Sequence, residues 1–289
     1  MKPPEKIVAL FLVRNEEWIL RASITAARNW CDAIVVMDHN SIDQTPSIAK
    51  DMADVYIRKD GDTWHEMVFR QELLETGRSL DATHYALIDA DEILTANLYE
   101  SAREKLLSYG CGEVLMVPMI APWRSPFKRR VDKGCVWPNA FISIGLAEDR
   151  YGPLASKMYW SDGTETYQHH QREPKLNRGL INWRPKTGGG CFHMQWAVWE
   201  RLVAKHRWYK MMERLRYPQK PVDLINRQYS LALDEHGLEL EYTPREWIDP
   251  AVFDRIDTQH TPWHIEAASE MIKKHGLETF SGLELWWEV

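Results

Sequence analysis

The chain has 289 residues, of which 44% are hydrophobic and 27% are charged. This balance is that of an ordinary globular protein, and it excludes a disordered chain. The net charge of −6 gives no overall basic surface, so charge alone does not predict extensive nucleic-acid binding.

Two further features bear on where the protein works. Its four cysteines form no C-x-x-C pair and offer neither a zinc ribbon nor a tight disulfide framework, which favours a reducing compartment: Cys31, Cys111, Cys135 and Cys191. The longest apolar run near the start, Ile7–Val13, is too short for a membrane span and lacks the cleavage site of a signal peptide. We therefore expect a cytoplasmic protein with no transmembrane segment.

The first 120 residues alternate short apolar runs with amphipathic stretches. The runs that predict buried strands are Ile7–Val13, Ala33–Met37, Val55–Arg58, His84–Ile88 and Val114–Met119. The stretches that predict helices are Glu16–Asn29 with Asn15 as its cap, a helix from Pro46 with Thr45 as its cap, Trp64–Ser79 and Leu98–Tyr109. This alternation predicts an α/β fold, with a Rossmann-like, mainly parallel sheet and helices on both faces.

After residue 120 the pattern changes. Pro122–Lys133 is basic and irregular, Cys135–Gly145 is a possible strand, and residues 146–192 are rich in loops. Three helices are predicted from there on: Trp196–Arg216, Asp223–Gly237 and His264–Gly276. We expect one domain over residues 1–195, with halves 1–120 and 121–195, followed by a helical extension over residues 196–289.

Three polar clusters each follow a predicted strand: Arg14–Glu17, Asp38–Thr45 and Asp89–Glu92. Ligands of such sheets bind at the carboxyl ends of the strands, which meet at one edge. We therefore expect the three clusters to converge there.

The strongest single signal is the pair Asp89 and Asp91, which follows the strand residues Tyr85–Ile88 directly. Two carboxylates at i and i+2 can both approach one hard cation, and Mg²⁺ or Mn²⁺ shares its shell with phosphate oxygens and water. A metal there would neutralise the charge on a diphosphate leaving group. The alternative is a solvated acidic turn, and the position after a buried strand favours the metal site.

The other two clusters have structural alternatives. Asp38 at a strand end can accept a hydrogen bond from a base edge, while Asx or Ser/Thr turns and a helix cap explain the same residues. A capped helix start explains Arg14–Glu17 nearly as well as a ligand contact does.

Together the clusters resemble glycosyltransferase family 2. The likeness covers roughly residues 5–110 and rests on V-R-N-E-E, D-H-N-S-I-D-Q-T, R-Q-E-L-L and Y-A-L-I-D-A-D-E-I-L. It implies a GT-A fold and an inverting enzyme that uses a nucleoside diphosphate sugar with Mn²⁺ or Mg²⁺. It also implies roles for residues at matching positions: the nucleotide would be held by Arg14, Asn15, Glu17 and Asp38, the D-x-D metal motif would be Asp89 and Asp91, and Arg70 would lie near the donor.

The sequence departs from the family pattern in two places. Gln44 replaces the usual glycine of the second loop, and the second half shows neither an E-D nor a Q-x-x-R-W motif, so the processive branch is not expected. The resemblance also leaves the catalytic base unassigned. We choose Asp149, with Glu148 as the alternative, because both follow the predicted strand Phe141–Gly145; a surface salt bridge explains either residue as well.

Several histidines and tryptophans lie in or near the loop-rich part of the chain. His193 occupies the chain position of the late histidine that completes the metal shell in many GT-A enzymes, although a structural hydrogen bond is the alternative. The pair His169–His170 favours a solvated loop over a substrate contact. Most of the 14 tryptophans are expected to pack in the interior, and one or two of four could form a platform for the acceptor: Trp123, Trp137, Trp160 and Trp183.

These observations favour a hexosyltransferase that moves a sugar from a nucleoside diphosphate sugar, by family analogy a UDP-sugar, to a hydroxyl acceptor. The acceptor could be a glycan, a lipid-linked sugar, a protein or a hydroxylated nucleobase in DNA. The basic stretches Arg124–Lys133 and Arg201–Lys220 are most simply solvated faces, and an acidic acceptor is their functional alternative. A metal-dependent nucleotidyltransferase would show a glycine-rich loop after the first strand, and a non-catalytic carbohydrate-binding protein would not need Asp89 and Asp91.

Overall fold

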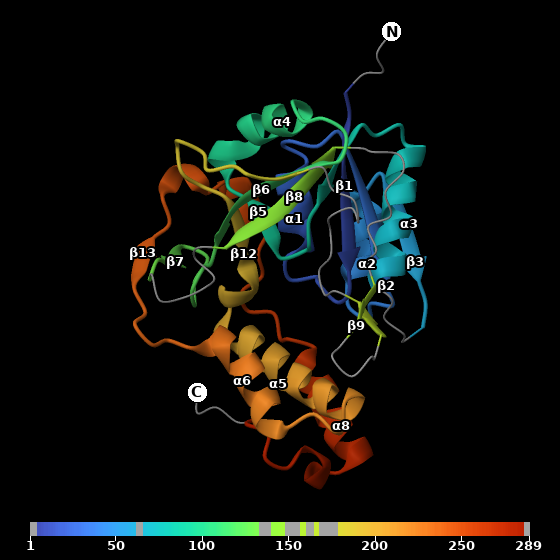
Figure 1. Cartoon of the computed structure of the whole chain (residues 1–289), viewed down its shortest axis with the longest axis vertical. Coiled ribbons are helices and arrows are strands. Elements are labelled where there is room, and N and C mark those ends of the chain that lie inside the picture. The colour runs from blue at the N-terminus through green and yellow to red at the C-terminus, as the bar shows by residue number, and fades with distance from the viewer. Residues whose placement is uncertain are drawn as a thin grey trace. The chain divides into compact units, whose positions relative to one another are not determined.

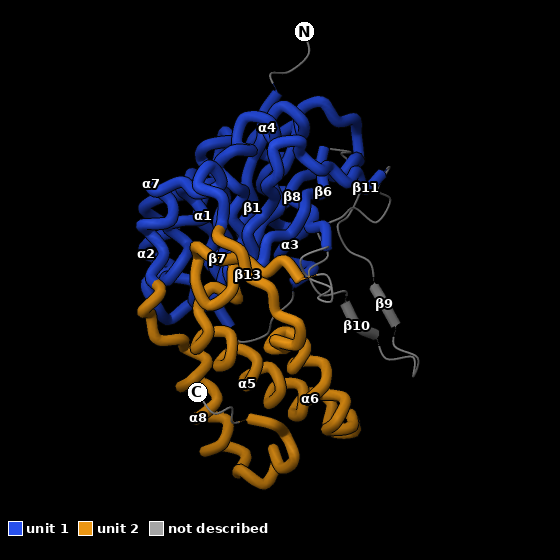
Figure 2. The backbone as a smooth tube through the Cα atoms, turned by 90° about the vertical axis from the view of Figure 1, so that its left-hand side faces the viewer, with its two compact units in different colours: residues 1–121, 135–194, 243–257 blue, residues 122–134, 195–242, 258–289 orange. Residues whose placement is uncertain are grey.

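The computed structural model describes residues 5–61, 66–132, 140–147, 157–159, 165–167 and 179–285 (Figure 1). The chain divides into two compact units (Figure 2). Unit 1 comprises Met1–Ala121, Cys135–Met194 and Thr243–Asp257, and unit 2 comprises Pro122–Gly134, Gln195–Tyr242 and Thr258–Val289. The expected boundary at residue 195 lies next to one of these divisions. A single boundary there would put Pro122–Gly134 in the first unit and Thr243–Asp257 in the second. The structure instead places Pro122–Gly134 in unit 2 and Thr243–Asp257 in unit 1.

Unit 1 is built on a nine-stranded sheet with the order β3–β2–β1–β4–β8–β6–β12–β5, and β11 pairs with β6. Its strands are β1 Ile7–Val13, β2 Ala33–His39, β3 Val55–Lys59, β4 His84–Leu87, β5 Glu92–Leu94, β6 Glu113–Ile120, β8 Phe141–Ala147, β11 Gly179–Asn182 and β12 Cys191–His193. Strands β1 to β4 are mutually parallel, and β11 and β12 are parallel to β6. Strand β8 is antiparallel to β4 and β6, and β5 is antiparallel to β12. The predicted α/β fold with a mainly parallel sheet is confirmed.

The helices of unit 1 cover the centre of this sheet. They are α1 Leu20–Ala27, α2 Thr45–Met52, α3 Glu66–Ser79, α4 Tyr99–Leu107 and α7 Pro250–Phe253, with short 3-10 turns at Ala96–Leu98 and Arg245–Trp247. Successive strand residues point to opposite faces, and every residue of β1 and β2 is buried. Both faces of the central strands are therefore covered. On one of them Leu73 and Leu74 of α3 pack in a cluster with Leu10 of β1 and Met37 of β2.

One predicted helix start is wrong by four residues and another by one, and both lie at the site edge. Helix α1 begins at Leu20 rather than Glu16, and Asn15 adopts a left-handed conformation (φ 53°) instead of capping it. Helix α2 begins at Thr45 with Gln44 as its N-cap. The polar side chains expected to cap helices bond to a neighbouring loop instead. The expected starts at Trp64 and Cys135 lie outside the described residues, and β5 was not predicted.

Unit 2 is mainly helical, as expected. It contains α5 Trp199–Arg216, α6 Val222–Ser230 and α8 His264–His275, with 3-10 turns at Leu231–Leu233 and Leu277–Phe280, and another, Met194–Trp196, runs into it from unit 1. A small ribbon of β7 Lys128–Arg130 and β13 Leu240–Tyr242 lies in the stretch predicted to be irregular. A second ribbon, β9 Lys157–Tyr159 with β10 Glu165–Tyr167, belongs to unit 1. Among the described residues, no helix has the length and apolar character needed to cross a bilayer.

The basic stretches of unit 2 are not simple solvated faces. In the first, Arg130 is buried and forms an ion pair with Asp132 at 2.6 Å, and Arg124 and Arg129 pair with Glu235 and Glu241 at 3.0 and 2.5 Å. In the second, Arg201 and Lys210 are buried. The three arginines of the first stretch are paired with carboxylates and the two named cations of the second are buried, so these five residues give the nucleic-acid acceptor no support.

Candidate functional site

The carboxyl ends of several strands of unit 1 meet at one edge of the sheet. Strands β1, β2, β3 and β4 run in the same direction, and β6 and β12 share that direction because β8 is antiparallel to both β4 and β6. The segments after β1, β2 and β4, together with His193 at the end of β12, therefore lie along this edge. The predicted convergence of the three polar clusters follows from this strand order.

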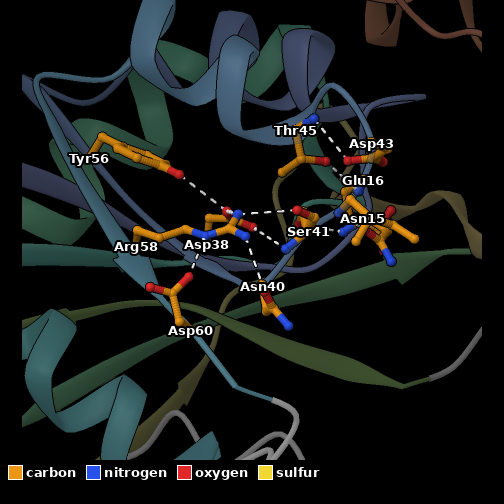
Figure 3. Close-up of polar contacts among 11 residues, drawn as sticks. Asn15, Glu16, Asp38, Asn40, Ser41, Asp43, Thr45, Tyr56, Arg58 and Asp60 are labelled. Atoms are coloured by element: carbon orange, nitrogen blue, oxygen red, sulfur yellow. Dashed lines mark hydrogen bonds and ion pairs between the residues drawn. The ribbon is translucent and has the colours of Figure 1, made fainter.

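The loop after β1 and the loop after β2 are joined by hydrogen bonds (Figure 3). The Asn15 backbone N–H donates to Ser41 Oγ at 2.8 Å, and the Ile42 N–H donates to Asn15 Oδ1 at 2.8 Å. Asn15 and Asn40 both have left-handed backbones, with φ near 50°, a conformation that asparagine adopts more readily than most residues. These two residues give the loops the tight turns that bring them together.

Three further hydrogen bonds join the same loops. The Glu16 N–H donates to Thr45 Oγ1 at 2.7 Å, and the Glu17 N–H donates to Asp43 Oδ2 at 3.2 Å. The Gln44 N–H donates to the Glu17 carboxylate. Asn15 and Glu17, two of the residues expected to hold the nucleotide, thus hold the neighbouring loop, and their contact with a nucleotide stays a prediction.

Asp38 is fully buried at the end of β2. Its Oδ1 accepts a hydrogen bond from the Ser41 N–H at 3.2 Å, and its Oδ2 accepts one from the Tyr56 hydroxyl at 3.2 Å and forms an ion pair with Arg58. Burial, followed by the Asp38 charge, raises the pKa of the Tyr56 phenol, which therefore stays protonated and donates. Asp38 is at the predicted place, but its oxygens are engaged within the protein.

Tyr56 and Arg58 are site residues that sequence reasoning missed. They lie two apart on β3, so they share one face of the strand, and Arg58 is directly opposite Asp38 in the register. Besides Asp38, the Arg58 guanidinium contacts Asp60 Oδ1 at 3.0 Å and Asn40 Oδ1 at 3.1 Å. The available signal was a tyrosine and an arginine alternating on an otherwise apolar strand beside the predicted Asp38.

The acidic turn after β4 is closed by its own groups. The Asp89 N–H donates to Glu92 Oε2 at 2.8 Å, and the Glu92 N–H donates to the Asp89 carbonyl at 3.1 Å. Asp89 Oδ1 forms an ion pair with Arg70 Nη2 at 2.8 Å, and Arg70 Nε lies 3.0 Å from Glu66 Oε1. Arg70 is therefore beside the D-x-D turn and orients the first aspartate, and its position near the donor stays a prediction.

The second aspartate faces the predicted histidine. Asp91 Oδ2 lies 3.6 Å from His193 Nε2, and a small part of each side chain is exposed, 12% and 18%. Two features fix this approach: β12 pairs with β5 so that His193 is opposite Glu92, and the Met194 N–H donates to the Asp91 carbonyl at 2.7 Å.

The donor set suits a metal that is also held by its substrate. A carboxylate oxygen and an imidazole nitrogen are acceptable ligands for Mn²⁺, and the remaining positions of such metals are commonly filled by phosphate oxygens and water. Across the described ranges, no three His, Cys, Asp or Glu side chains gather closely enough to hold a metal by themselves. Asp91 and His193 come together, whereas Asp89, the third expected ligand, is turned to Arg70.

The glycine run before β12 explains how His193 reaches the turn. A Cβ on Gly190 would lie 2.0 Å from the Pro118 carbonyl oxygen, and Gly189 has φ 93°. Thr95 fixes this close passage: its N–H donates to the Gly190 carbonyl at 2.9 Å, and its Oγ1 accepts from the Gly190 N–H at 3.1 Å. The run lets the chain pass β6 closely and deliver His193 to the site.

Several candidates lie outside the described residues: Glu148, Asp149, His169, His170, Trp137 and Trp160. The strand before the two carboxylates, β8, is antiparallel to β4 and ends with Ala147 beside His84, at the edge opposite Asp91. The described part of β8 therefore ends away from Asp91, and the role of Glu148 or Asp149 as the base stays a prediction.

Of the two described tryptophans proposed as an acceptor platform, Trp123 is buried in unit 2, where its Nε1 donates to Glu235 at 2.8 Å. It therefore cannot offer an open face for stacking. Trp183, in unit 1, is half-buried.

Comparison with known proteins gives similarity to solved structures only. No protein-family profile and no curated protein matches the sequence. One similar structure is glucosyl-3-phosphoglycerate synthase from Mycobacterium tuberculosis with Mn²⁺, UDP and glucosyl-3-phosphoglycerate, with 18% identity over 42% of this chain and 45% of that chain and a TM-score of 0.32. Others are S. aureus TarS residues 1–349 with UDP, with 16% identity over 40% and 36% and a TM-score of 0.32, and a mycobacterial protein, with 16% over 43% and 43% and a TM-score of 0.33. The matches span less than half of those chains.

Proposed function

We propose that this protein is a metal-dependent glycosyltransferase that moves a sugar from a UDP-sugar to a hydroxyl acceptor with inversion. The observation that carries the proposal is the approach of Asp91 and His193 to 3.6 Å at the sheet edge, next to an Asp89 carboxylate held by Arg70. A ligand pair at the carboxyl ends of parallel strands is where a diphosphate would be bound.

The residues divide the work on the donor. Asp91 and His193 would hold Mn²⁺ or Mg²⁺, which supplies charge neutralisation for the diphosphate leaving group. Asp89 and Arg70 supply a carboxylate and a cation fixed by an ion pair of 2.8 Å, so they keep their geometry when the donor arrives. The loops after β1 and β2 form one hydrogen-bonded wall for the nucleotide beside them.

The strand order supports a GT-A type of fold for this site. Four parallel strands in the order β3–β2–β1–β4 are followed by the antiparallel β8, and the three motif clusters come in the order expected from the resemblance to glycosyltransferase family 2. Inversion also needs a general base for the acceptor hydroxyl, and Asp149 or Glu148 in this role stays a prediction from sequence.

Donor hydrolysis tests the proposal. UDP-glucose, UDP-galactose and UDP-N-acetylglucosamine are incubated with the protein and Mn²⁺, and the products are separated. We expect free sugar and UDP, both dependent on the metal. Release of pyrophosphate from a nucleoside triphosphate would point to the nucleotidyltransferase alternative. Binding of a glycan without any donor turnover would point to the non-catalytic one.

The choice of nucleotide has its own measurement. Titration calorimetry of UDP, GDP and CMP, each with and without Mn²⁺, should show tightest binding for UDP and a gain from the metal. Tighter binding of GDP or CMP would overturn the choice of UDP without contradicting the proposed metal site.

A further inference from the structure

The corner of the site formed by β2 and β3 contains a buried carboxylate and a partly exposed guanidinium. Asp38 is fully buried, whereas the Arg58 side chain is 32% exposed. Arg58 contacts Asp38 Oδ2 directly, and the Tyr56 hydroxyl donates to the same oxygen at 3.2 Å (Figure 3). A ligand arriving at this corner therefore meets the guanidinium of Arg58, because the carboxylate behind it has no exposed surface.

The guanidinium is held firmly, and part of it stays accessible. Its Nε donates to Asp60 Oδ1 at 3.0 Å, its Nη1 donates to Asp38 and to the Ser41 carbonyl, and its Nη2 donates to Asn40 Oδ1 at 3.1 Å. A side-chain hydrogen bond with Tyr56 adds to these contacts. The planar group is therefore fixed in orientation, while 32% of the side chain is exposed to an arriving ligand. The hydrogen bond to Asp60, with further support from Asp38, raises the pKa of Arg58, so the group stays charged.

The position of this corner matches the far end of a nucleotide. Strand β3 is three places from β4 in the sheet, with β2 and β1 between them. Neighbouring strands are about 4.8 Å apart, so the two strand ends are separated by roughly 14 Å. If a diphosphate lies at Asp91, the molecule that also reaches Arg58 is an extended nucleoside diphosphate, with its base at the β2–β3 corner.

We infer that Arg58, rather than Asp38, contacts the base of the bound nucleotide by donating to a carbonyl oxygen of a pyrimidine, and that Asp38 is a positioning residue that acts through Arg58. This inference rests on the proposed function, because it assumes that a nucleoside diphosphate is the ligand. It assigns recognition of the nucleotide base to Arg58 of β3, a strand that lies outside the three polar clusters predicted from the sequence.

Calorimetric titration with Mn²⁺ and either UDP or ADP tests the inference in five forms of the full chain. These are the wild type, Arg58→Met, Asp38→Asn, the double variant of these two, and the control Arg103→Met. Arg103 forms a comparable pair with Asp32, at 2.9 Å, on the side of the sheet where β1 begins. Adenine has no carbonyl oxygen, so ADP reports nucleotide binding without the proposed contact.

We expect Arg58→Met to weaken UDP binding by about 10- to 100-fold, the loss for a charge-assisted hydrogen bond, and ADP binding by less than about threefold. Asp38→Asn should have a smaller effect, because the amide oxygen still accepts from Arg58. The double variant should bind UDP like Arg58→Met alone. It also contains no uncompensated buried charge, so it keeps the test available if Arg58→Met folds poorly. Arg103→Met should match the wild type.

Two results would overturn the inference while the proposed function stands. One is a double variant that melts like the wild type yet binds UDP more weakly than Arg58→Met, which would show that Asp38 itself contacts the base. The other is an equal loss for UDP and ADP in Arg58→Met. A wild-type protein that binds no nucleoside diphosphate would instead remove the proposed function, and the inference with it.

Discussion

The loops after β1 and β2 and the turn after β4 differ in what their polar side chains do. In the loops, Asn15, Ser41 and Thr45 are buried, and each side chain accepts a hydrogen bond from a backbone N–H of the other loop. In the turn, Asp89 is fixed by Arg70, while Asp91 and His193 approach each other with part of their surface open. Polar residues after a buried strand can therefore be ligands or supports, and only exposure and bonding partners separate the two. We therefore interpret the loops as structural supports and the turn after β4 as the part of the site that binds the metal and the reacting groups.

The largest effect that separates the two regions is expected at Asp91. Asp91→Asn keeps the shape of the side chain and removes the charge that would bind the metal. We expect turnover of the UDP-sugar to fall by about 10³-fold, since a catalytic metal contributes several kcal/mol, with an unchanged melting temperature. Asp51→Asn is the control, because Asp51 is exposed and pairs with Arg21 on the surface. Wild-type turnover in the Asp91 variant would place the chemistry elsewhere.

The next effect concerns the segment that delivers His193 to the turn. In Gly190→Ala the new methyl group would lie 2.0 Å from the Pro118 carbonyl oxygen, so the backbone must move. We expect the free energy of unfolding to fall by about 3 kcal/mol, as for severe overpacking, and Mn²⁺ binding to weaken. Gly179→Ala is the matched control, because its nearest neighbour would be 3.9 Å away. Equal urea midpoints for the two variants would contradict the close passage.

A smaller effect is expected when His193 itself is removed. His193→Ala takes away one of two protein ligands while the substrate's phosphates remain, so we expect Mn²⁺ affinity in the presence of UDP to fall by about 10- to 100-fold. Turnover should recover in part at high Mn²⁺ concentration, which a loss of structure would not allow. The exposed His236 provides the control variant, His236→Ala. If metal affinity is unchanged, the 3.6 Å approach to Asp91 is a structural contact only.

The sheet and the order of the site segments were predictable because they depend on local signals. Continuous apolar runs identify buried strands, and a carboxylate pair after Ile88 identifies the edge. The direction of β8 was not predictable, because an antiparallel and a parallel strand have the same apolar pattern. The sequence argument for Asp149 expected this strand to end on the donor side, whereas its last described residue, Ala147, lies beside His84.

The hydrogen-bond partners of the loop residues could not be predicted from the sequence either. Asparagine and threonine are preferred at helix N-caps, so the local sequence predicts that Asn15 and Thr45 cap helices. Their observed partners are 27 to 29 residues away, so tertiary pairing of two loops decides the outcome. The same holds for Arg58, because its contact with Asp38 depends on the pairing of the neighbouring strands β2 and β3.

The smallest effect should come from the loops and should mark them as supports. Ser41→Ala removes the hydroxyl that accepts from the Asn15 N–H at 2.8 Å. A buried donor left without its acceptor costs about 1 kcal/mol or somewhat more of unfolding free energy. We expect that loss in urea titration, with turnover number within about twofold of wild type, because the group touches no reacting atom. Ser108→Ala, at an exposed hydroxyl that donates to the Lys105 carbonyl, should leave both quantities unchanged. If Ser41→Ala instead lowers turnover as strongly as Asp91→Asn while stability is retained, the loops take part in the chemistry and the contrast between the two regions disappears.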